Sequence, residues 1–228
     1  MSTMANDRRE LSDAGSTARL SAGLMFAVAS AVSFGLAGAL GRGLIDTGWS
    51  AGAITLVRVS LGAAALTPFA LAALRGRWGL LRSNLGLLLT YGVVAVAGAQ
   101  FCYFSAVQHM QVGPAILIEF TAPAAVVVFL WLRHGQRPGP MTLAGAVVAA
   151  LGLVLVLDLV SGADLSVRGV VWALGAMVGC ATYFIISADE DNGLPPLALA
   201  WGGLLFGAVA LAALGLVCLL YTSDAADE

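Results

Sequence analysis

Charged residues are scarce in this chain of 228 residues: only 11% are Asp, Glu, Lys or Arg, whereas 60% are hydrophobic. A soluble domain averages about 25% charged residues. None of the eleven basic residues is lysine, and no basic run is long enough to form a surface for nucleic acid. The composition therefore excludes a nucleic-acid partner and predicts an integral membrane protein.

Cysteine and histidine are also scarce, and neither forms a recognisable ligand set. Cys102, Cys180 and Cys218 all lie inside apolar stretches, where cysteine packs as a small hydrophobic residue. His109 and His134 have no second His, Cys or carboxylate at ligand spacing. No nucleophile with its base and no pair of intramembrane aspartates is visible. We therefore expect no metal or cofactor, and not an enzyme.

Long apolar segments are what the sequence has in abundance. A bilayer core about 30 Å thick requires roughly 20 apolar residues in a helix. The sequence thus predicts an all-α fold, a polytopic membrane bundle of about seven transmembrane helices. The seven segments are Leu20–Leu40, Ala51–Leu74, Leu85–Val107, Val112–Leu132, Met141–Leu157, Gly169–Ala188 and Leu197–Leu220.

The arginines are distributed unevenly between the loops. Eight of them precede the first segment or lie between segments two and three or four and five, whereas the opposite loops hold only Arg42 and Arg168. Cytoplasmic loops of membrane proteins collect Lys and Arg. Residues 1–19 are therefore predicted to be cytoplasmic, in a multi-pass protein of a bacterial inner membrane.

The first and sixth segments share a rhythm of glycine, bulky apolar residues and small residues, in "GLMFAVASAVSFGL" and "GVVWALGAMVGCAT". This similarity predicts a five-helix unit at 20–158, followed at 169–220 by the first two helices of an inverted second copy. The polar end "YTSDAADE", at 221–228, resembles translated adaptor sequence, and we expect it to be non-native.

Two glycine pairs, Gly175 with Gly179 and Gly203 with Gly207, fit the G-x-x-x-G pattern of closely packed membrane helices. Because the chain holds 28 glycines, chance matches are expected. Packing within the bundle is the preferred interpretation, and a homodimer contact is the alternative.

The fourth apolar segment contains a single carboxylate, that of Glu119. A charge near the middle of a span costs about 2.5–3.5 kcal/mol on insertion scales, so it normally faces the bundle interior or a watered cavity. Pro123 cannot donate a hydrogen bond to the carbonyl of Glu119, four residues earlier. The carboxylate and the freed carbonyl suit a proton or a substrate amine. A protonated Glu119 bonded to another helix is the alternative.

Polar residues in two other segments are candidates for the same cavity. Arg58 lies about two turns from the predicted outer end of its segment. It is suited to bind a substrate carboxylate, to pair with Glu119 or to extend to the interface along its aliphatic stem. Gln100 and Tyr103 lie three residues apart on one helical face. An acid and a base together would hold both ends of an amino acid.

These segments resemble the EamA family of the drug/metabolite transporter superfamily. The resemblance rests on "GLMFAVASAVSFG", "ITLVRVSLGAAAL", "AQFCYFSAVQHM" and, most closely, "VGPAILIEFTAPAAVVVFLWLRHGQRPGP". Within it, "LIEFTAP" is similar to segments of the threonine and homoserine exporter branch. In the family, ten helices form two inverted repeats around a central cavity, and transport is usually outward and often coupled to protons. The resemblance implies such a carrier, truncated after about seven helices.

Three functions remain open from the residues. The first is an exporter of a small amino-acid-like metabolite by proton exchange, with Glu119 and Arg58 at the substrate. The second is an exporter of cationic drugs or sugar derivatives, and a cation would need only Glu119. The third is a non-transporting membrane subunit. For a transporter, the expected partners are a small-molecule substrate, protons and the lipid bilayer.

Overall fold

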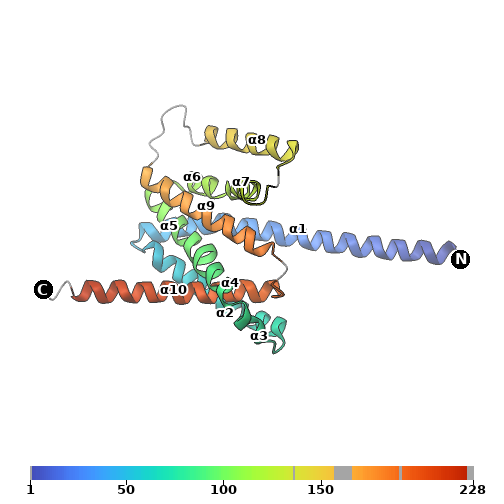
Figure 1. Cartoon of the computed structure of the whole chain (residues 1–228), viewed down its shortest axis with the longest axis horizontal. Coiled ribbons are helices and arrows are strands. Elements are labelled where there is room, and N and C mark those ends of the chain that lie inside the picture. Colours follow the sequence, from blue (N-terminus) through green and yellow to red (C-terminus); the bar gives the residue numbers. More distant parts are fainter. Residues whose placement is uncertain (1, 136, 157–165, 190–191, 225–228) are drawn as a thin grey trace. The chain divides into compact units, whose positions relative to one another are not determined.

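The computed structural model describes residues 2–135, 137–156, 166–189 and 192–224, and these residues form helices without a strand (Figure 1). The predicted all-α class is therefore confirmed. In chain order the helices are α1 (Ser2–Asp46), α2 (Ala51–Leu74), α3 (Gly79–Ser83), α4 (Leu85–Thr90), the π-helix η1 (Tyr91–Gly98), α5 (Ala99–His109), α6 (Val112–Glu119), α7 (Ala122–His134), α8 (Pro140–Val156), α9 (Val167–Ser187) and α10 (Pro196–Asp224).

Six described helical segments are long and apolar enough to cross a membrane: Gly23–Asp46, Ala51–Leu74, Leu85–His109, Val112–Arg133, Val167–Ser187 and Pro196–Leu216. The predicted fifth span corresponds to α8, a shorter apolar helix of 17 residues. The end of that predicted span, Leu157, lies outside the described residues. The predicted non-native tail is described only as far as Asp224, where α10 ends.

The chain divides into two compact units, Met1–Gly41 and Arg42–Glu228. The first unit consists of most of α1. The second unit contains every candidate site residue. Its buried apolar side chains form two clusters, one where α5 and α6 pack on α9 and one where α2, α4 and η1 pack on α10. Figure 1 shows α9 running beside α5 and α10 running beside α2.

The third span is not a single regular α-helix, because the eight residues of η1 take the wider π-helical form. Such π segments are rare and often lie near functional sites. The sequence of η1, "YGVVAVAG", shows no local signal for it. Tyr91 stacks on Tyr183 with ring centroids 5.7 Å apart and shares a hydrogen bond with Ser187 at 3.3 Å. Tyr91 is buried, whereas 42% of Tyr183 is exposed, so this contact joins the interior of the third span to the surface of α9.

The two G-x-x-x-G motifs are used for packing inside the chain. A Cβ atom added at Gly179 would lie 2.6 Å from the Cβ of Ala99 and 2.9 Å from the carbonyl oxygen of Val94. One added at Gly207 would lie 2.9 Å from the carbonyl oxygen of Gly92. These glycines let α9 and α10 approach η1 and α5 to backbone contact. Packing within the bundle, the preferred interpretation, accounts for both motifs.

This close approach predicts a large difference between two glycine substitutions. Gly179→Ala should destabilise the bundle by about 1–3 kcal/mol, because the added methyl group overlaps backbone and Cβ atoms that cannot rotate away. Gly86→Ala is the matched control, since Gly86 is an exposed helical glycine with no atom within 4 Å of an added Cβ. Alanine favours a helix, so this control should be neutral or stabilising. Unfolding of both variants in detergent measures the difference, and equal stabilities would contradict the packing.

Candidate functional site

The fourth span is broken in its middle, at the residue that carries the carboxylate. α6 ends at Glu119, and α7 begins at Ala122 with Pro123 in its first turn. Between them, Thr121 donates from its backbone N–H to the carbonyl oxygen of Ile118 at 3.1 Å and from its hydroxyl to the same oxygen at 2.7 Å. Non-helical backbone at membrane depth is tolerated where protein buries it or a watered cavity meets it. Glu119 and Ala122, at the two ends of the break, are buried, so the break has one side in the interior of the bundle.

Pro123 acts through the backbone rather than as a lining residue. Its own ring is exposed, whereas Ala115 and Ala122 are fully buried on either side of Glu119. In one continuous helix, Pro123 would lie four residues after Glu119, on nearly the same face. The break changes that register, so Pro123 and Glu119 do not share a buried face. The missing N–H at Pro123 still leaves the carbonyl of Glu119 without its usual helical donor.

The carboxyl group of Glu119 is enclosed by protein. Only 7% of the residue is exposed, and its Oε2 atom is buried with no hydrogen-bond partner among the described residues. In native structures nearly every buried polar atom has a partner, and an unpaired one costs about 1–3 kcal/mol. Glu119 is therefore the candidate binding residue of this part of the bundle.

Arg58 of α2 reaches the same region from a neighbouring helix. Its guanidinium carbon lies 5.9 Å from the centroid of the Phe104 ring, in the range of a cation–π contact. Arg58 is half-buried, and its charge interacts with both Glu119 and Tyr103. Within the described residues, no ion pair closer than 4.0 Å joins Arg58 to Glu119. The acid and the base face one environment without neutralising each other in direct contact.

α5 supplies two further polar groups to the interior. Tyr103 is 4% exposed, and its hydroxyl oxygen is buried without a partner among the described residues. The Oε1 atom of Gln100, one helical turn away, is also buried without a hydrogen-bond partner. Tyr103 interacts electrostatically with Glu119 and Arg58, so these three residues come together, whereas Gln100 has no described contact with Glu119.

The three residues also lie at a similar depth. Arg58 is the eighth residue of α2 and Glu119 the eighth residue of α6, while Tyr103 precedes the end of α5 by six residues. At 1.5 Å per residue, each lies about 10 Å from the same predicted outer end of its helix. The three side chains therefore lie at one level of the bundle.

Two neighbours of this site were not anticipated from the sequence. Phe104 is 1% exposed and supports the guanidinium of Arg58. Cys180 of α9 lies close enough to Glu119 for the two groups to interact electrostatically. Both are ordinary apolar-segment residues in the sequence, so only their neighbours in the fold give them this place. No group of three or more potential metal ligands occurs among the described residues.

A multi-pass helical membrane protein with an acid, a base and a hydroxyl group in its interior fits a transport protein. Residues 21–158, more than half of the chain, match the EamA-like transporter family, and the chain belongs to that family. Membership indicates a transporter rather than an enzyme.

Similar curated proteins carry a more specific name. The chain is 33% identical to the threonine/homoserine exporter RhtA of Escherichia coli K12, and 31% identical to RhtA of Salmonella typhimurium LT2, each over 121 residues. The aligned region makes up 52% of this chain but only 38% of each relative, so the chain covers well under two thirds of their length. No solved structure matches the chain.

Proposed function

We propose that the protein is a secondary transporter that exports a small amino-acid-like metabolite across the bacterial inner membrane in exchange for protons. The observation that carries this proposal is the buried, unpartnered carboxyl oxygen of Glu119 at a helix break, within electrostatic range of Arg58. The names of the RhtA relatives support the substrate class, although the shared region is a minor part of those proteins.

The two ends of an amino acid fit the two sides of the break. The ammonium group would bind the carboxylate of Glu119 and the carbonyl freed by Pro123, at the negative end of the α6 dipole. The substrate carboxylate would bind the guanidinium of Arg58, which donates bidentate hydrogen bonds. The Tyr103 hydroxyl would donate to or accept from a polar side chain. Broken helices at substrate sites are a recurring design of secondary transporters.

Proton exchange follows from the use of one carboxylate for two ligands. A protonated, neutral Glu119 attracts an ammonium group weakly, whereas an ionised Glu119 attracts it strongly. Proton and substrate therefore compete for the same group. If the site opens alternately to the two sides, this competition makes the two fluxes run in opposite directions.

The proposal also covers the orientation of the chain in the membrane and its division into two repeats. The arginine distribution supports a cytoplasmic N-terminus, which puts the site nearer the outer face of the membrane. We further propose that residues 20–158 form the first repeat and residues 169–220 begin the second. No homodimer contact through the glycine motifs is needed, because helices of the same chain already fill them.

Uptake by inverted membrane vesicles tests the function. With the proposed orientation, vesicles that contain the protein should accumulate labelled threonine or a related amino acid when their interior is acidified. A protonophore should abolish accumulation but not exchange. Vesicles without the protein are the control. Uptake of an organic cation in place of amino acids would favour a cation exporter, and transport of neither class would contradict the proposal.

A further inference from the structure

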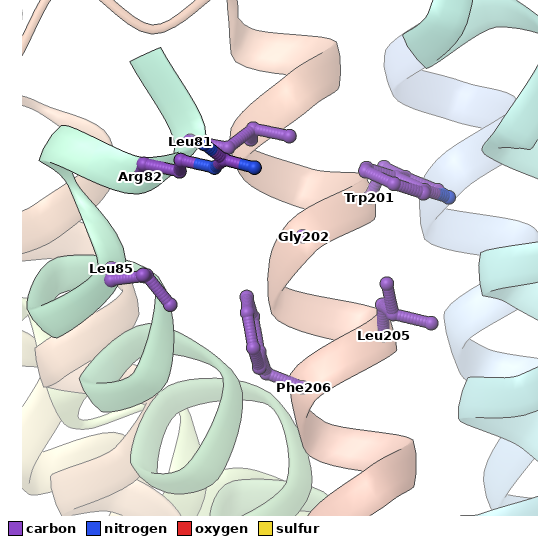
Figure 2. A pocket seen from close by; sticks show the side chains of 7 residues that line it. All are labelled: Leu81, Arg82, Leu85, Trp201, Gly202, Leu205 and Phe206. Atoms are coloured by element: carbon purple, nitrogen blue, oxygen red, sulfur yellow. The ribbon is translucent and has the colours of Figure 1, made fainter. Parts of the chain in front are cut away.

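A cavity lies where α3 and α4 meet α10. It encloses about 200 Å³ and is lined by apolar side chains, among them Leu85, Leu205 and Phe206. Figure 2 shows Arg82 and Trp201 at one end of this cavity and Leu205 and Phe206 at the other. Leu85 and Leu205 are exposed, so the cavity opens to the surroundings of the bundle.

The size and lining of this cavity do not suit a polar metabolite. Pockets for drug-sized ligands usually enclose about 300–1,000 Å³ and carry several convergent polar groups. This cavity is smaller, its lining surface is apolar, and Arg82 is the one charged residue among those that line it. Its apolar walls match a segment of hydrocarbon chain, and its arginine matches an anionic group at the end of that chain.

Two more arginines lie where α2 ends beside the start of α10. A wider cavity of about 530 Å³ there is lined by Arg75 and Arg77 together with apolar residues such as Phe69 and Leu197. Arg75, Arg77 and Arg82 are all exposed, and none forms an ion pair within the described part of the chain. Among the described residues between α9 and α10, Asp189 is the acidic one, and it lines neither cavity.

The surrounding helices hold these cavities in a fixed shape. The indole N–H of Trp201 donates to the hydroxyl of Thr67 at 3.0 Å, which joins α10 to α2. The side-chain amide of Asn84 donates to the carbonyl of Asn192 at 3.2 Å, which joins the start of α4 to the loop before α10. Tryptophan and arginine at a span end are typical of the level of lipid headgroups.

We propose that this end of the bundle binds one anionic phospholipid of the leaflet that faces it. Arg82 contacts the phosphate, Arg75 and Arg77 add positive charge in the same loop, and part of one acyl chain fills the cavity between Leu85 and Phe206. The favoured leaflet is the cytoplasmic one, because these arginines belong to the loop that the charge distribution places inside. Basic pockets between helices on that side bind anionic headgroups in other membrane proteins.

Native mass spectrometry of the purified protein tests this site with phosphatidylglycerol and phosphatidylcholine of identical chains. We expect selective retention of one phosphatidylglycerol. Arg82→Gln should weaken that retention about fivefold, the effect of one arginine at an anionic surface. Arg133→Gln is the matched control, because Arg133 is an exposed arginine of the same predicted side that lines neither cavity. Leu85→Trp, which fills the cavity from its exposed edge, should also release the lipid while the charges remain.

Several outcomes would overturn the proposal. Equal retention of the two lipids would show that the headgroup charge is not recognised. Equal effects of Arg82→Gln and Arg133→Gln would show that the lipid does not bind at Arg82. Competition by glycerol phosphate as effective as that by the lipid would show a site for a free phosphate compound instead. If Arg82→Gln fails to purify as a folded protein, lipid retention by Leu85→Trp becomes the test. Retention by Leu85→Trp equal to that of the parent would contradict an acyl chain in this cavity.

Discussion

Replacing Glu119 by glutamine is expected to abolish proton-driven accumulation of substrate while leaving the bundle folded. Glutamine has nearly the same shape but cannot hold a negative charge or exchange a proton. Loss of one charge-assisted hydrogen bond should weaken substrate binding by roughly 10- to 150-fold. The folded bundle should tolerate the change, because Glu119 is 7% exposed and a neutral amide is easier to bury than a charge. Vesicle uptake and thermal unfolding in detergent measure the two effects.

Asp46→Asn provides the control for this variant. Asp46 lies at the end of α1 and its carboxylate pairs with the Nε atom of Arg42 at 3.1 Å, in an exposed position. Exposed pairs contribute little to stability. Asp46→Asn should therefore transport as the parent does. Full gradient-dependent accumulation by Glu119→Gln would mean that Glu119 binds neither the proton nor the substrate amine.

Replacing Arg58 by glutamine is expected to change the choice of substrate. The variant should lose the guanidinium that binds a carboxylate, with a loss of affinity of roughly 10- to 150-fold for amino acids. An amine of the same size that lacks the carboxylate should bind the parent and the variant about equally. Arg58→Lys should lie between the two, because lysine keeps the charge but not the bidentate geometry. Competition against labelled substrate with both ligands gives the comparison.

Arg168→Gln is the matched control, since Arg168 is an exposed arginine at the start of α9. It should leave both affinities unchanged. If Arg58→Gln spares amino acids while Glu119→Gln does not, the arginine does not hold the substrate carboxylate. The site would then suit a cationic substrate better than a zwitterion.

Much of the fold could be predicted from hydropathy, because each span must supply a long apolar helix. α2 has the predicted bounds, Ala51–Leu74. The broken fourth span could not be predicted fully. Pro123 signalled a lost hydrogen bond. It did not signal the two hydrogen bonds that Thr121 donates to the carbonyl oxygen of Ile118 at the break, because other local geometries would also fit a proline there. The π form of η1 had no signal in its own residues, and the glycines of α9 and α10 that pack closely on it are distant in sequence.

The candidate site was predictable where a polar residue interrupts an apolar run. Glu119, Arg58 and Tyr103 stand out for that reason, and the structure brings them together. Phe104 and Cys180 could not be found in the same way, because an apolar residue in an apolar segment carries no signal of its own. Their place depends on how α2, α5 and α9 pack around Glu119.

The most direct test of the central claim is whether substrate protects Glu119 from a hydrophobic carbodiimide. Such reagents modify protonated carboxyl groups in apolar surroundings, and within the described spans Glu119 is the one acid away from a span end. Mass spectrometry of peptides from the treated protein gives the fraction of Glu119 modified. The proposed site predicts modification that falls as amino-acid substrate is added and that is unaffected by non-transported solutes. Modification that is the same with and without transported substrate would contradict it.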